Sequence, residues 1–339
     1  MYAVTDEAFM ARALDLAAQG TGFTEPNPRV GAVLVHEGRI IGEGYHHRAG
    51  EPHAEIMALA NVRREDLKLL AASTMYVTLE PCSHTGRTGP CSLALVQSGV
   101  RRVVVAHGDP NPHVSGRGIS QLKDAGIDVL VGPGSARAGE LNRAFFHSMV
   151  QGRPWITLKW AEDATGHLDG RRSTAHPGPW SITGPEAGVV THRLRQTCGA
   201  LLVGAGTWLA DGTRGTVRAV AGPEIPRIIW ASRPLSPADA KRAAEQGWAV
   251  WGPRPGESPA EAWNAALSSC GLRGILVEGG ARILAELLAL DLWDEAYRWQ
   301  SPHPLPDPGT AAPAFPGAWM HVGRYGRDEL YRARRVNFT

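Results

Sequence analysis

The sequence predicts two α/β domains, because strand and helix patterns alternate along both halves of the chain and tryptophan use changes abruptly between them. The first of the eleven tryptophans is Trp155. A chain of 339 residues also exceeds what one hydrophobic core usually holds. We place the domains at 1–150 and 151–339, with the boundary beside a Gly-Arg-Pro break that follows one short predicted helix within 132–154.

The first half is predicted to be a three-layer α/β sandwich. It opens with a helix that Thr5 can cap and Gly20 can end, because apolar residues recur there at helical spacing. A hairpin over 26–47 follows, with its turn at Glu37-Gly38. Strands then alternate with helices, which implies right-handed crossovers. The expected helices are 53–62, 91–99 and 118–126, and the expected strands are 74–79, 101–109 and 127–132.

The second half alternates in the same way. The apolar runs predict strands at 154–161, 200–206, 226–232, 248–252 and 274–280. Helical spacing predicts helices at 185–199, 236–247 and 281–290. Proline recurs through 301–317, which we expect to be a loop.

Composition and charge exclude several classes of protein. A formal net charge of +2 provides no basic field for nucleic acid, so a small polar ligand is the expected partner. The N-terminus lacks the pattern of a secretory signal, and no apolar run is long enough to span a bilayer. These features predict a cytoplasmic protein, in which cysteines are metal ligands or buried fillers. We expect Cys198 and Cys270 to be fillers.

One histidine and two cysteines form a candidate catalytic zinc site. His53 opens a predicted helix, Cys82 follows a predicted strand, and Cys91 opens the next helix. Catalytic zinc sites keep three protein ligands and one water molecule. Residues two apart on a helix point about 200° away from each other, so Glu55 is expected beside the metal and not on it. Zinc would acidify the water and Glu55 would relay protons, which is the arrangement of zinc deaminases.

The spacing of the cysteines departs from the general deaminase signature, HxE followed by PCxxC. Here the second cysteine lies nine residues after the first, in PCSHTGRTGPC. A structural zinc site, or two unrelated core cysteines, is the alternative interpretation. The combination of HAE, a strand ending in EPC and a helix-opening cysteine favours catalysis.

Longer motifs in the first half resemble the deaminase domain of the bifunctional riboflavin-biosynthesis deaminase/reductases. They are PNPRVGAV, GEGYHHRAGEPHAEIMAL, YVTLEPCSHTGRTGPC and GDPNPHVSGRGI, and the resemblance covers about residues 8–147. The long gap between the cysteines is that family's own pattern. The resemblance implies a cytidine-deaminase-like fold. It also implies that 2,5-diamino-6-ribosylamino-4(3H)-pyrimidinone 5′-phosphate loses its 2-amino group as ammonia.

The same resemblance implies a set of substrate contacts in this half. Asn offers a donor and an acceptor to a pyrimidine edge, and Arg can meet a phosphate with two donors. Asn27 and Asp109 could instead be turn residues, and His84 and Arg87 could lie in a solvated loop. His46 is preferred over His47 only on its spacing to HAE. The positions carried over are Asn27, His46, His84, Arg87, Asp109 and Asn111.

The second half resembles the reductase domain of that family, which has a dihydrofolate-reductase-like α/β fold. The resemblance implies NADPH-dependent reduction of the ribosyl group to ribityl, and a homo-oligomer. Lys159, Arg195 and Arg218 would hold the phosphate and sugar, and Asp211 would orient the ribosyl group. Glycines after a strand let backbone N–H groups approach cofactor phosphates. The substrate and NADPH positions implied are Lys159, Trp180, Thr183, Arg195, Thr207, Asp211, Arg218, Glu278, Gly279 and Gly280.

Three segments of the second half depart from the family pattern. The family's SLDG becomes AEDATGHLDG, which leaves either Thr165-Gly166 or Asp169-Gly170 in its place. ADNPxLTxR becomes ADGTRGTVR, and APKLLGG becomes QSPHPLPDPGT. Three alternatives to the bifunctional enzyme therefore stay open. They are a deaminase with an inactive reductase-like half, a deaminase of another nucleoside or nucleic acid, and a structural zinc module.

Overall fold

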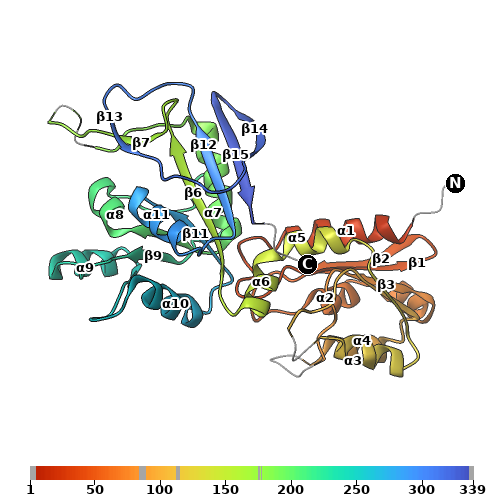
Figure 1. Cartoon of the computed structure of the whole chain (residues 1–339). Helices are drawn as coiled ribbons and strands as arrows, with labels where there is room; N and C mark the ends of the chain where they lie inside the picture. Colours follow the sequence, from red (N-terminus) through yellow and green to blue (C-terminus); the bar gives the residue numbers. More distant parts are fainter. Residues whose placement is uncertain (1–4, 84–88, 112–114, 175, 177, 336–339) are drawn as a thin grey trace. The chain divides into compact units, whose positions relative to one another are not determined.

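The computed structural model describes residues 5–83, 89–111, 115–174, 176 and 178–335. The chain folds into two compact units, Met1–Gly152 and Arg153–Thr339, each with its own sheet (Figure 1). Within the described ranges, none of the helices combines the length and apolarity needed to cross a membrane.

The first unit is built on a five-stranded sheet with the order β2-β1-β3-β4-β5. The predicted hairpin is present, with positive φ at both turn residues, Glu37 and Gly38, as a two-residue hairpin turn requires. β1 pairs antiparallel with β2 and β3, and the last three strands are parallel. The strands are β1 (Gly31–His36), β2 (Arg39–Tyr45), β3 (Thr74–Val77), β4 (Arg102–Val105) and β5 (Asp128–Val131).

Helices cover both faces of this sheet, which confirms the predicted three-layer architecture (Figure 1). Along β1, Ala32 and Leu34 pack in a core with α2, α3 and α4, whereas Val33 and Val35 pack with α1 and α5. The period-2 alternation of strand side chains thus separates two cores. The helices are α1 (Asp6–Ala18), α2 (Ala54–Ala60), the 3₁₀ helix η1 (Arg64–Ala72), α3 (Cys91–Ser98), α4 (Arg117–Asp124), α5 (Ser135–Leu141) and α6 (Arg143–Gln151).

Two details of the first unit differ from the sequence prediction. The single short helix expected before the boundary is two helices, α5 and α6, which meet at Asn142. The buried Asn142 amide accepts from Arg29 N and donates to Arg29 O, both at 2.8 Å, so it is fixed by a partner 113 residues away. Thr5 does stand at the N-cap of α1, but its side chain makes no capping hydrogen bond.

The second unit contains an eight-stranded sheet with the order β10-β9-β8-β11-β6-β12-β15-β14. The strands from β10 to β12 are parallel to their neighbours, and β15 and β14 are antiparallel additions at one edge. The strands are β6 (Trp155–Glu162), β8 (Leu201–Gly204), β9 (Arg227–Trp230), β10 (Trp248–Trp251), β11 (Gly274–Glu278), β12 (Glu295–Gln300), β14 (Met320–Tyr325) and β15 (Asp328–Arg334). β7 (His167–Gly170) and β13 (Pro308–Ala311) form a separate pair, so the expected loop over 301–317 contains a short strand.

Helices again pack on both faces of the large sheet. Trp263 of α10 and Leu284 of α11 lie in one core, and Trp208 of α8 and Ala243 of α9 lie in another. Cys198 is buried as expected, but Cys270 is only partly buried, because it caps the exposed end of α10. The helices are α7 (Pro185–Cys198), α8 (Ala205–Asp211), α9 (Pro237–Glu245), α10 (Pro259–Ser269) and α11 (Ala281–Ala289).

Candidate functional site

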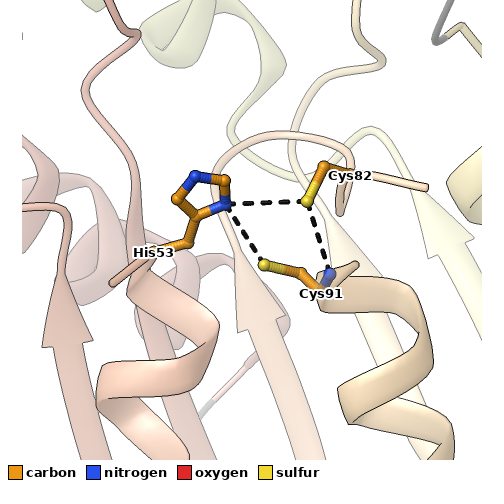
Figure 2. Close-up of side chains that lie close together, drawn as sticks. All are labelled: His53, Cys82 and Cys91. Atoms are coloured by element: carbon orange, nitrogen blue, oxygen red, sulfur yellow. Dashed lines mark hydrogen bonds between the residues drawn. The ribbon is translucent and has the colours of Figure 1, made fainter. Parts of the chain in front are cut away.

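The first unit brings His53, Cys82 and Cys91 together (Figure 2). His53 is the N-cap of α2, Cys91 is the first residue of α3, and Cys82 lies in the loop after β3. His53 Nδ1 lies 3.2 Å from Cys91 Sγ and 3.6 Å from Cys82 Sγ. The Cys91 amide donates to Cys82 Sγ at 3.3 Å. Three elements distant in sequence thus converge on one point.

This cluster fits a zinc ion. The three ligand atoms lie within 4.8 Å of one another. Zn–S and Zn–N bond lengths in a tetrahedral site require N···S separations of roughly 3.6 Å, close to those observed. The hydrogen bond with the Cys91 thiol, and then that with His53, lowers the pKa of Cys82. A lowered pKa favours the thiolate form, which is the form that binds metal.

Glu55 lies in the first turn of α2, two residues after His53, and its side chain is buried. Burial raises the pKa of Glu55 to about 7. In the described part of the chain, no group hydrogen-bonds its Oε2. A buried carboxyl group with a free oxygen and a pKa near neutrality is suited to taking up and returning a proton.

Asn27 and His46 lie together beside this cluster. Asn27 Nδ2 is 3.1 Å from His46 Nε2, and the His46 ring lies edge-on to the His53 ring with centroids 5.4 Å apart. His46 Nδ1 is 3.2 Å from the Pro52 carbonyl oxygen. Nδ1 therefore carries the proton, and Nε2 accepts from Asn27. Burial lowers the pKa of His46, which keeps the ring neutral.

Asp109 and Asn111 follow β4. His84 and Arg87 lie outside the described residues, so the roles expected for these two residues stay predictions. Asp109 Oδ1 accepts from the Asn111 amide at 2.9 Å, which is the turn contact foreseen as the alternative for Asp109. The sequence prediction missed Glu80, the residue that holds this segment. Its buried carboxylate accepts from four backbone amides, those of Asp109, Gly116, Gly118 and Ile119, at 3.0–3.4 Å.

Glu80 lies two residues before the ligand Cys82, so its hydrogen bonds tie the loop that carries Cys82 to the segment from Asp109 to Ile119. A Cβ at Gly118 would lie 1.9 Å from the Pro81 carbonyl oxygen, so the start of α4 packs directly on this loop. We expect Glu80→Gln to weaken the segment by about 2–4 kcal/mol, because buried amide donors lose a charged acceptor. Hydrogen exchange of the Gly116–Ile119 amides should quicken at least about tenfold. The exposed Glu65→Gln is the control, and equal exchange in both variants would contradict this role.

The second unit has a cavity of about 1310 Å³ beside the ends of β6, β8 and β11. All ten positions expected to bind substrate or NADPH in this half line it: Lys159, Trp180, Thr183, Arg195, Thr207, Asp211, Arg218, Glu278, Gly279 and Gly280. These residues span 122 positions of the chain, from 159 to 280. The parallel strands therefore deliver their carboxyl ends and following turns to one place, where such sheets bind ligands.

Glu278 is the centre of an ion cluster in this cavity. Arg195 Nε and Nη2 donate to its carboxylate at 2.6 and 3.0 Å, and Lys159 Nζ lies 3.7 Å from Oε2. Burial alone would raise the pKa of Glu278, but the charges of Lys159 and Arg195 lower it to about 2. Arg195 also donates to the Thr216 carbonyl oxygen at 2.8 Å. Two of the three cations expected to hold the phosphate and sugar, Lys159 and Arg195, are thus already paired with an acid.

Four other expected positions, Thr207, Gly280, Trp180 and Asp211, also contact neighbouring residues. Thr207 Oγ1 accepts from the Gly280 amide at 3.0 Å, which joins α8 to the turn before α11. The Trp180 ring stacks on His176 with centroids 3.8 Å apart, and its Nε1 has no partner among the described residues. Asp211 is paired with Arg172, a cavity-lining residue that the sequence prediction missed.

The structure distinguishes the two positions left open for the family's SLDG. Asp169 lines the cavity, whereas Thr165 lies in the turn between β6 and β7 and is bonded to Asp163. The Asp163 carboxylate accepts from the amides of Thr165, His167 and Leu305 at 2.7–2.9 Å. One buried acid therefore fixes both the turn and the start of the divergent 301–317 segment.

We expect Asp163→Asn to lower the stability of the second unit by about 2 kcal/mol at pH 7. Burial raises the pKa of Asp163, but hydrogen bonds from Leu305, His167 and Thr165 outweigh burial and hold it at about 2. Because this pKa lies below the unfolded value, the contribution is complete above about pH 4 and disappears as the pH falls to about 2.

Urea unfolding followed by tryptophan fluorescence measures this effect, since all eleven tryptophans lie between 155 and 319. Asp307→Asn is the matched control, because that carboxylate is 59% exposed and only 3.9 Å from Arg171 Nε. A difference between wild type and Asp163→Asn that does not change from pH 7 to about pH 3 would contradict the assignment.

Comparison with known proteins identifies the class of the chain and then its family. Residues 3–107 match the cytidine and deoxycytidylate deaminase zinc-binding region, and residues 154–303 match the RibD C-terminal domain. The fold and the His-Cys-Cys site thus define a zinc-deaminase domain joined to a RibD-type C-terminal domain. These two families imply Zn²⁺ and NADPH as cofactors.

Three similar proteins show the extent of the match. RibD of Aquifex aeolicus is 48% identical over 225 residues, 66% of this chain but only 61% of that protein. RibD of Chlamydia muridarum is 33% identical over 329 residues, 89% of this chain and 86% of that protein. The solved diaminohydroxyphosphoribosylaminopyrimidine deaminase/5-amino-6-(5-phosphoribosylamino)uracil reductase of Thermotoga maritima is 31% identical, with a TM-score of 0.82 over 97% of this chain and 98% of that one.

The chain belongs to the RibD family of riboflavin biosynthesis proteins. The predicted resemblance and fold class are therefore confirmed.

Proposed function

We propose that the chain is a bifunctional enzyme of riboflavin biosynthesis, with a deaminase domain at 1–150 and a reductase domain at 151–339. The observation that carries the first activity is the buried carboxyl group of Glu55, whose Oε2 has no partner among the described residues, beside a zinc-compatible His-Cys-Cys cluster. The substrate proposed is 2,5-diamino-6-ribosylamino-4(3H)-pyrimidinone 5′-phosphate. Water replaces its 2-amino group, and the products are ammonia and 5-amino-6-(5-phosphoribosylamino)uracil.

Each residue of the deaminase domain has a distinct role in this proposal. His53, Cys82 and Cys91 would hold the zinc ion, which would supply the acidity that activates a water molecule for attack. Glu55 would accept one proton from the water and deliver it to the ring nitrogen. It would then accept the second proton, from the hydroxyl group added to the ring carbon, and deliver it to the amine that leaves as ammonia. Neutral His46 holds Asn27, whose amide meets the pyrimidine edge. Asp109, Asn111, His84 and Arg87 are the remaining substrate contacts proposed.

Ammonia release from three substrates tests this specificity. We expect turnover of the phosphoribosylated diaminopyrimidine and at least about 10³-fold lower kcat/KM for cytidine, which lacks the matching 2-amino group. Single-stranded RNA should not react, since the chain has a net charge of only +2. Comparable rates on cytidine or RNA would contradict the substrate assignment.

For the second activity, the observation that carries the proposal is the gathering of ten expected positions in one cavity. NADPH bound there would supply a hydride to the ribosyl group, which would thereby be reduced to the ribityl chain. Lys159 and Arg195, held by Glu278, face the substrate, and Arg218 adds a further cation for its phosphate. Trp180, Thr183, Thr207, Asp211, Gly279 and Gly280 complete the proposed substrate and cofactor contacts.

NADPH oxidation by the purified protein, given the deaminated substrate, tests the reductase. Sustained oxidation is expected, and a zinc protein that deaminates but never consumes NADPH would establish the inactive-domain alternative. We also propose a cytoplasmic homo-oligomer, on the strength of the family resemblance and the sequence pattern. Light scattering that shows a monomer at working concentration would contradict the oligomer.

A further inference from the structure

One guanidinium on the wall of the second unit's cavity lies between two carboxylates. Arg172 Nη2 donates to Asp169 Oδ2 at 3.0 Å and also to Asp211 Oδ1, while Nε donates to Asp169 Oδ2 at 3.3 Å. All three side chains line the cavity. Arg172 therefore halves the net negative charge that these two carboxylates would otherwise direct into the cavity.

Arg172 also joins two segments of the wall. Asp169 lies on β7 and Asp211 is the last residue of α8. Arg172 Nη1 donates to the carbonyl oxygen of Ala210 at 2.9 Å, next to the end of that helix. Carbonyl groups at a helix C-terminus carry partial negative charge, so the guanidinium meets three groups of the same sign. A planar side chain with five donors can satisfy all three, which an ammonium cannot do in the same geometry.

Other acids of the cavity have other partners. Glu278 is paired with Arg195 and Lys159, and Asp239 lies 3.1 Å from Arg242. Both Asp169 and Asp211 form an ion pair with Arg172. Removing it would leave two carboxylates on one wall without that charge compensation.

We propose that Arg172 is a positioning residue for the cofactor, which fixes Asp211 and offsets part of the negative charge of the Asp169–Asp211 wall so that a polyanionic dinucleotide can bind. This inference rests on the proposed reductase function. NADPH carries a pyrophosphate and a further phosphate group, and repulsion between like charges is poorly screened inside a cavity. Arg172 acts on the cofactor through the two carboxylates that it binds and does not itself take part in the hydride transfer.

Binding of NADPH to the full chain, measured by quenching of tryptophan fluorescence, tests this role. We expect Arg172→Met to raise the Kd at least about tenfold, as when like charges are brought together at a binding surface. Arg172→Lys should give an intermediate Kd, because it keeps the charge but not the planar set of donors. The control is Arg171→Met, because that side chain is 75% exposed and 3.9 Å from Asp307, and its Kd should equal that of wild type.

The double variant Asp169→Asn/Arg172→Met separates charge from structure. It removes one of the two exposed negative charges, so it should bind NADPH more tightly than Arg172→Met, a gain that a purely structural role does not predict. An unchanged Kd in Arg172→Met, or no gain in the double variant, would overturn the proposal. If Arg172→Met does not fold, an Arg172→Lys Kd equal to wild type overturns it. Failure of the wild-type chain to bind NADPH would instead overturn the reductase function itself.

Discussion

Glu55→Gln removes deamination, with an expected fall in kcat of about 10³-fold, while zinc stays bound. Glutamine has nearly the shape of glutamate but cannot accept and return a proton. Glu55 is not among the three metal-ligating side chains, so zinc content should equal that of wild type. Since burial disfavours the ionised form of Glu55, the neutral amide should not lower the melting temperature. Ammonia release and zinc content by atomic absorption measure the two effects.

The exposed Glu7→Gln on α1 is the control for this substitution and should keep full activity. Loss of zinc together with activity in Glu55→Gln would show that the carboxylate is a ligand. Retention of activity would favour the structural zinc module, because such a module has no use for a proton carrier.

Cys91→Ala is expected to lose both zinc and ammonia release, the latter by at least about 10³-fold. A catalytic zinc site needs all three protein ligands, and Cys91 contributes its thiolate from the first position of α3. NADPH oxidation with the deaminated substrate should stay within about twofold of wild type, since the chain forms two compact units.

Cys198→Ala is the matched control, because Cys198 is also buried but packs in a core of the second unit. It should keep zinc and ammonia release. Zinc retained in Cys91→Ala, or lost in Cys198→Ala, would contradict the ligand assignment.

The sequence predicted the first unit well, because its signals are local and repeat along the chain. Alternating apolar residues in β1 face two different helical layers, and the hairpin turn at Glu37-Gly38 has its own sequence signature. The zinc cluster followed from three residue types at the ends of predicted elements. Glu80 was not predicted, because its four backbone partners lie 29–39 residues away.

The second unit was predicted less completely. β12, β14 and β15 escaped prediction because charged residues interrupt their apolar patterns, and Glu295 on β12 is buried with a long-range partner, Arg334. α10 could have been found, since Ser258 and Glu261 form a capping box with a local signature. Arg172 had no such signal, because its partner Asp211 is 39 residues away.

The central claim is that deamination and reduction occur in one chain and in that order. The most direct test is NADPH oxidation by the Glu55→Gln variant, given each of two substrates in turn. With the deaminated pyrimidine we expect oxidation at the wild-type rate, because Glu55 lies in the other unit. With the diaminopyrimidine we expect no oxidation until wild-type deaminase is added. Two results would contradict the account. The first is NADPH consumption by Glu55→Gln with the diaminopyrimidine alone. The second is no NADPH consumption by Glu55→Gln with the deaminated pyrimidine, under conditions in which the wild type consumes NADPH with that substrate.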